Sequence, residues 1–173
     1  MAILSHAFVS VFAQGEHPAN KTTRNMIVDV AISNKDFSTL MTALKAADLV
    51  GALQGNGPST VFVPTNDALA KIDSKVLSSL LEYENKNTLF NILTYHVIAG
   101  KLAATDVVTA LGKGNGSVVL TALNSEAITV MQKDGKICLK DTNDNYSEIT
   151  ASDVKADNGV IHVINTVVMP KNN

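Results

Sequence analysis

The sequence has one cysteine, Cys138, no tryptophan and a single arginine, Arg24, among its 173 residues. One cysteine excludes an intrachain disulfide and a zinc site built from several cysteines. Fourteen lysines and arginines stand against 16 acidic residues, for a net charge of −2. They form no cluster of the kind that phosphate contacts need, so nucleic-acid binding is not expected. No apolar run approaches the roughly 18 residues that would span a bilayer.

What the sequence does have is 46% apolar and only 17% charged residues, which predicts one folded globular domain. We place this domain at residues 26–170, with a flexible polar arm at 14–25 and a short tail at 171–173. Residues 1–13 are mostly apolar and end in Val11-Phe12-Ala13, a small-x-small pattern typical of a signal-peptidase site. No Lys or Arg precedes Lys21, so this segment is either an atypical export signal or an apolar leader.

The domain is predicted to be helical first and strand-rich later, which makes an α+β fold. Apolar residues spaced three and four apart predict helices at residues 26–31, 34–53, 74–81 and 87–93, one capped by Thr65 and a short one after Thr105. Strands are expected at residues 60–63, 118–121, 127–131, 136–139 and 160–169. Asp134-Gly135 separates two of these strands and is a strong hairpin signal.

Three short segments resemble the signatures of the fasciclin domain family. Thr60–Leu69 (TVFVPTNDAL) is similar to the first signature, Tyr95-His96 matches the central Tyr-His pair, and Asn158–Ile164 (NGVIHVI) is similar to the second. The resemblance covers about residues 26–170, with mild departures at Val63, Leu69 and Asn165. The residues that we assign to the structural signature are Thr60, Phe62, Pro64, Thr65, Asn66, Asn158, Gly159 and His162.

The resemblance implies a compact antiparallel β-sandwich, or wedge, packed with several short helices. It also implies a secreted, extracellular or periplasmic protein, either free or attached to a surface, that contacts extracellular proteins, matrix or cells without catalysis. The family's partner-binding positions correspond here to Tyr95, His96, Asp153 and Val154. The alternative is an extracellular carrier of an apolar small molecule such as a carotenoid, because some single-domain relatives have that role. No other cofactor is expected.

Several motifs that suggest chemistry have a simpler interpretation. His96 and His162 lie in segments that we interpret as apolar strands, so we expect hydrogen-bonded core residues and no metal site. Asp141–Asn145 begins like a calcium loop, but Tyr146 replaces the turn glycine, and we expect a polar loop. The glycine-rich run at 112–116 precedes no helix and is not a phosphate loop.

No catalytic motif is present, so enzymatic activity is not expected. Three Asn-x-Ser/Thr triplets, at Asn20, Asn115 and Asn145, are formal glycosylation sites.

Overall fold

The computed structural model describes residues 25–55 and 58–171. The expected leader at 1–13, the arm up to residue 24, the Asn20 triplet and the last two residues of the tail lie outside the described residues. The division into leader, arm, domain and tail stays a prediction. Asn25, the last residue of the arm, is joined to Asp157 by two hydrogen bonds of 2.8 Å.

The core of the fold is a single seven-stranded sheet, in which the strands follow the order β2-β1-β7-β6-β5-β4-β3. In chain order the strands are β1 (Ser59–Pro64), β2 (Val97–Ala99), β3 (Ser117–Thr121), β4 (Ala127–Lys133), β5 (Lys136–Lys140), β6 (Tyr146–Ala156) and β7 (Gly159–Ile164). All neighbouring strands are antiparallel except β1 and β7, which pair in parallel from Ser59↔Gly159 to Pro64↔Ile164. A bridge between Ile98 and Ala122 brings the two ends of the sheet together.

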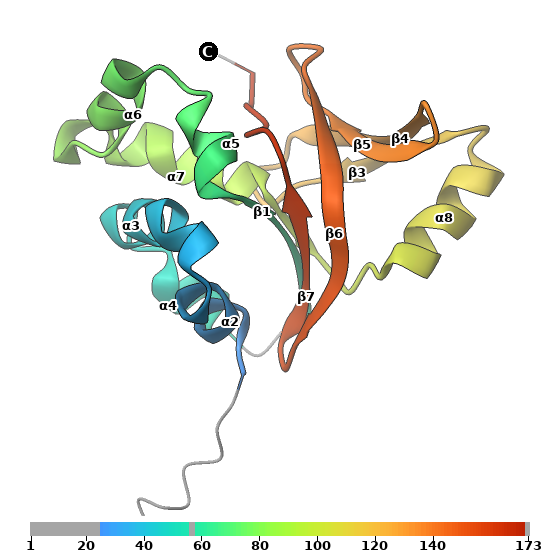
Figure 1. The fold of residues 1–173 in the computed structure, drawn as a ribbon, viewed down its shortest axis with the longest axis horizontal. Helices are drawn as coiled ribbons and strands as arrows, with labels where there is room; N and C mark the ends of the chain where they lie inside the picture. Colours follow the sequence, from blue (N-terminus) through green and yellow to red (C-terminus); the bar gives the residue numbers. More distant parts are fainter. Residues whose placement is uncertain (1–24, 56–57, 172–173) are drawn as a thin grey trace, which may run out of the picture.

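Most of the helices cover one side of strands β1 and β7 (Figure 1). They are α2 (Ile27–Ser33), α3 (Ser38–Ala46), α4 (Val50–Leu53), α5 (Asn66–Ala70), α6 (Ser74–Leu80) and α7 (Lys86–Tyr95), with 3₁₀ turns η2 (Lys35–Phe37) and η3 (Tyr83–Asn85). Their apolar stripes pack on Val61, Val63 and Ile161 and form the first core cluster. Burying these stripes is what stabilises such short helices, because isolated helices of this length are marginal in water. We call this half of the molecule the helical side.

The remaining helix, α8 (Ala104–Lys113), lies on the opposite side, next to strands β3 and β4 (Figure 1). Val107 and Leu111 of α8 contribute to a second core cluster with Ile128, Val130 and Leu139. We call this half the α8 side. None of the helices in the described ranges is long and apolar enough to cross a membrane.

The α+β class and the sheet wedged with helices are confirmed, as is the hairpin at Asp134-Gly135, where β4 pairs with β5. Two strands were missed. β2 has only three residues, and β6 alternates short polar and apolar residues without a strong apolar face. The last strand is shorter than expected, because β7 ends at Ile164 and not at Met169.

The prediction that His96 lies in an apolar strand was wrong. Helix α7 continues through Tyr95, and His96 is its C-terminal cap residue. Strand β2 begins only at Val97. The run of apolar residues across the junction conceals the boundary, since a buried helix end and a buried strand have the same composition.

Candidate functional site

Tyr95 is an internal residue that joins the two halves of the molecule. Its side chain is 0% exposed, and its hydroxyl donates a 2.8 Å hydrogen bond to the carbonyl of Ala127, at the start of β4. The pKa of Tyr95 is raised to about 12, mainly by burial and secondly by the negative charge of Asp141. Tyr95 is therefore a neutral hydrogen-bond donor at physiological pH and is unavailable to a partner at the surface.

His96 is equally enclosed, with 3% of its surface exposed. Its Nδ1 lies 2.8 Å from the carbonyl of Ile92, and its Nε2 lies 3.3 Å from the backbone nitrogen of Val168. A backbone N–H can only donate, so Nε2 is the acceptor and Nδ1 carries the proton. Burial lowers the pKa of His96 to about 4, while the hydrogen bond to Ile92 opposes that shift. His96 thus fastens the end of α7 to the segment after β7 as a neutral ring.

His162, on β7, makes the corresponding contacts on the α8 side. Its Nε2 lies 2.7 Å from the carbonyl of Leu102, and its Nδ1 accepts a longer bond, 3.4 Å, from the backbone nitrogen of Asp153. The ring stacks on Phe62 with centroids 5.7 Å apart. The Thr60 hydroxyl accepts from the backbone nitrogen of Leu102 at 2.8 Å, so both polar groups of that residue are bound. The two histidines hold different segments and form no common site.

Asn158 is a signature residue on the helical side whose side chain makes three hydrogen bonds to backbone groups. Its amide nitrogen donates to the carbonyls of Leu53 and Gly55 at 2.7 and 3.1 Å, and its amide oxygen accepts from the nitrogen of Ile27 at 2.9 Å. The next residue, Gly159, has no room for a side chain, because a Cβ at this position would lie 1.9 Å from the carbonyl oxygen of Ser59. This pair ties the start of β7 to α2, α4 and β1.

The first signature fastens a helix in the same way. Pro64 ends β1, and the Thr65 hydroxyl caps α5 by accepting from the nitrogen of Ala68 at 3.2 Å. The Asn66 side chain accepts from Thr39 at 3.0 Å and donates to the carbonyl of Lys35 at 2.9 Å, so it links α5 to α3 and η2. In the described part of the chain the signatures therefore mark joints between elements.

Asp153 and Val154 lie apart from the Tyr-His pair, on strand β6. The register of β6 against β7 shifts between Ala151 and Val154, and Asp153 at this bulge has a left-handed φ of 58°. Its carboxylate accepts a 2.8 Å bond from the nitrogen of Ala104, the first residue of α8. Asp153 is exposed, whereas Val154 is half-buried against the helical core. Of the four expected partner-binding residues, only these two reach the surface, and the structure does not bring all four together.

Asp141 is a structural residue that the sequence reasoning placed in a surface loop. Its carboxylate is buried and accepts from the backbone nitrogens of Asn143, Asn145 and Met169 at 2.8, 2.9 and 3.1 Å. It also accepts from the side chain of Asn145 at 3.2 Å, which engages the amide that glycosylation would modify. The Asp that opens this loop thus binds backbone donors, and no group of three metal-ligating side chains occurs in the described ranges.

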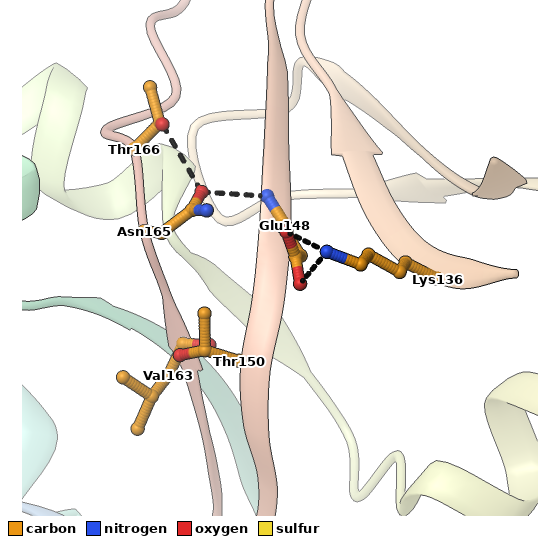
Figure 2. Close-up of polar contacts among 6 residues, drawn as sticks. All are labelled: Lys136, Glu148, Thr150, Val163, Asn165 and Thr166. Carbon is orange, nitrogen blue, oxygen red and sulfur yellow. Dashed lines mark hydrogen bonds and ion pairs between the residues drawn. The ribbon is translucent and has the colours of Figure 1, made fainter. Parts of the chain in front are cut away.

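Asn165, one of the departures from the second signature, is a hydrogen-bond acceptor (Figure 2). Its amide oxygen accepts from the backbone nitrogen of Glu148 at 2.9 Å and from the Thr166 hydroxyl at 3.2 Å. These bonds take the place of regular strand pairing just after Ile164, which explains why β7 stops there although apolar residues continue.

No pattern in the sequence predicts the groove between α8 and the β4–β5 hairpin. Two adjoining hollows of about 250 and 510 Å³ share Gly135 and Ile137 in their walls. The first reaches to His162, and the second runs along Val108 of α8, which is 57% exposed. Lys136 and Glu148 form an ion pair at the rim, with nitrogen–oxygen distances of 3.2 and 3.3 Å (Figure 2). The groove appears only when α8 has been placed across the sheet.

Comparison with known proteins gives matches along most of the chain. A family model described as the fasciclin domain matches residues 35–170. Protein sll1483 of Synechocystis is 48% identical over 144 residues, which is 83% of this chain and 73% of the relative. Human periostin is 32% identical over 166 residues, covering 94% of this chain and 18% of periostin.

A solved structure of a FAS1 domain pair from the insect cell adhesion molecule fasciclin I superposes with a TM-score of 0.72 at 21% identity, covering 83% of this chain and 50% of that one. This likeness supports the overall fold described above.

Proposed function

Because the chain belongs to the fasciclin domain family, we propose that it is a non-catalytic interaction module that binds extracellular protein, matrix or cell-surface partners. Its place of action is outside the cytoplasm, either secreted or periplasmic. The description of one structural relative as a cell adhesion molecule supports this proposal. So does the engagement of Tyr95, His96 and His162 in hydrogen bonds with the scaffold, which leaves contact with partners to other residues.

The observation that carries the proposal is the position of Asp153. This exposed carboxylate lies at a bulge in β6. The backbone nitrogen of Asp153 is bonded to His162, and its carboxylate is bonded to the first residue of α8. A charge held on both sides loses little conformational entropy when it binds, and it therefore contributes efficiently to recognition. Val154, next to it, anchors the bulge in the helical core. In this arrangement Tyr95 and His96 support the surface from within.

The test removes the charge of Asp153 and keeps its shape. Asp153→Asn retains an oxygen that can accept from Ala104 and a residue type that tolerates a left-handed φ. The matched control is Asp134→Asn, since Asp134 is also exposed and has a φ of 52°. Binding of the labelled protein to intact cells and to extracellular matrix of the source organism should fall at least five-fold for Asp153→Asn only. Equal binding by both variants would contradict the role of Asp153.

A second candidate function, extracellular transport of an apolar small molecule such as a carotenoid, is favoured by the groove between α8 and the β4–β5 hairpin. Its walls carry Val107, Val108, Leu111, Ile137 and Ile149, and together the two hollows are in the size range of ligand pockets. A ligand lying there would cover apolar surface on both α8 and the sheet.

Extraction of the native protein tests this candidate first, because a carrier would yield pigment or lipid. A binding assay then compares Val108→Glu with Val76→Glu, a similarly exposed valine of α6 far from the groove, using retinol fluorescence as the probe. A carrier loses retinol binding with the first variant only. Absence of retinol binding by the wild type, together with a clean extract, would reject transport.

A further inference from the structure

Strand β3 is an edge of the sheet, and among the described residues no strand pairs with its outer side. The carbonyl of Gly116 accepts from Gln132, and the nitrogen of Ala122 donates to Glu126, at 3.0 and 2.9 Å. Because antiparallel strands alternate their bonding sides, the even-numbered residues of β3 face β4, and the backbone groups of Val119 and Thr121 face away from it.

No partner strand is assigned to the outer side of β3 between Ser117 and Thr121 in the described part of the chain. Strand β2 approaches only beyond this stretch, where the nitrogen of Leu123 donates to the carbonyl of Val97 at 2.9 Å. The open part of the edge is therefore centred on Val119, whose surface is 64% exposed.

Edge strands of soluble proteins usually carry a lysine, a proline or a bulge that prevents pairing with another chain. The β3 sequence, Ser-Val-Val-Leu-Thr, contains no charge and no proline, and its register against β4 is regular along its full length. The other strands of this sheet region, β4 and β5, begin or end in lysines. This edge lacks the usual protection at the point where an apolar side chain is most exposed.

We propose that β3 pairs with β3 of a second copy of this chain, antiparallel and with the two-fold axis at Val119. The sequence is self-complementary in that register: Val119 lies opposite its own counterpart, Val118 opposite Leu120, and Ser117 opposite Thr121. Every cross-strand pair then matches apolar with apolar or hydroxyl with hydroxyl, which are favourable pairings in sheets. An uncharged edge also brings two copies together without repulsion. A symmetric pairing of one surface with itself is the commonest form of homodimer.

Such a dimer extends the sheet across two copies. It also presents two copies of each surface of the domain that lies outside the interface. Two weak contacts made at once bind far more tightly than one, so dimerisation would strengthen binding of any immobilised partner. The inference rests on β3 alone and holds whether or not Asp153 contacts a partner.

The first experiment measures the dimerisation of the purified full chain by sedimentation velocity over a range of concentrations. Val119→Lys should weaken dimerisation at least ten-fold, and Val76→Lys, a control of 49% exposure on α6, should leave it unchanged. Circular dichroism checks that both variants remain folded. A wild type that stays monomeric, or a dimer that survives Val119→Lys, would overturn the proposal.

The second experiment tests the register. Val119→Lys and Val119→Glu should each be monomeric alone and should dimerise when mixed, because the register places residue 119 opposite residue 119. Val119→Cys should also form a disulfide-linked dimer on oxidation, since directly opposite Cα atoms in a bonded pair lie about 5.5 Å apart. The native Cys138 is buried and does not compete. The pairing would be contradicted if the Lys and Glu variants fail to dimerise when mixed and Val119→Cys cross-links no better than Val76→Cys.

Discussion

The helical side and the α8 side of the molecule are built from the same sheet, yet they differ in how closely their helices pack on it. Between the helices and β1 lies an apolar cavity of about 20 Å³, lined by residues such as Leu44, Phe62 and His96. That volume holds about one water molecule. The larger hollows of the helical side, of about 390 and 290 Å³, lie along α7 and α6 and have no strand of the sheet in their walls. On the α8 side, hollows of about 250 and 510 Å³ lie between α8 and the sheet.

The family signatures follow this division. Asn158, Asn66 and His96 lie on the helical side and bind backbone groups of neighbouring elements. The α8 side also holds signature residues, among them Phe62 and His162, but these are buried there. Its surface has the groove, the uncharged β3 edge and the bulge at Asp153. The difference teaches that the recognisable motifs of this chain maintain its architecture, and that the surfaces available to ligands and partners are formed mainly by other residues. If so, substitutions should destabilise strongly on one side and weakly on the other.

The largest expected effect is that of Asn158→Ala. Removal of the Asn158 side chain leaves the carbonyls of Leu53 and Gly55 and the nitrogen of Ile27 without their partner in a buried region. Unsatisfied buried groups cost about 1–3 kcal/mol each, so we expect a loss of roughly 3–5 kcal/mol in the free energy of unfolding, measured by urea denaturation. Asn87→Ala, an exposed residue of α7, serves as control. A small loss in the free energy of unfolding for Asn158→Ala would contradict the expected difference between the two sides.

The second prediction concerns pH and His96. Because its pKa is lowered from 6.5 to about 4 in the folded protein, the unfolded chain takes up a proton first as pH falls. This contribution to stability is fully present above pH 6.5 and is lost as pH falls to about 4, with a total of about 3 kcal/mol. Urea titrations at pH 7, 5.5 and 4 measure it.

Carboxylates also titrate in this range, so the quantity to compare is the difference between the wild type and His96→Asn. That difference should shrink steadily as pH falls from 7 to 4. A difference that stays constant with pH would show that His96 is not held in its neutral form.

An intermediate effect is expected for His162→Ala, at the boundary between the two sides. The change leaves the carbonyl of Leu102 without its 2.7 Å partner and removes the ring stacked on Phe62. Thermal and urea unfolding should show a loss of about 1–3 kcal/mol. Retained binding of partners in the folded variant would mark His162 as a scaffold residue. Unchanged stability with loss of binding would place it in the contact surface instead.

The sequence was sufficient for the α+β class, the β4–β5 hairpin and the family, since these depend on local periodicity, turn chemistry and short motifs. It failed at His96, where a helix end and a strand share one apolar run. It also could not show that Asp141 binds Met169, because that bond joins residues 28 positions apart. The groove and the β3 edge depend on how α8 and the strand neighbours are placed, and no local pattern records that placement.

The smallest expected effect is that of Lys136→Ala on the α8 side. Lys136 pairs with Glu148 at 3.2 Å, but its side chain is 61% exposed, and surface ion pairs contribute about 0–1 kcal/mol. We expect a loss of about 0.5 kcal/mol at low salt that disappears in 0.5 M NaCl. Lys155→Ala, an exposed lysine of β6 without an ion pair to the described residues, is the control. A loss above 2 kcal/mol would mean that the rim of the groove is as tightly bound into the structure as Asn158, and the two sides would no longer differ in kind.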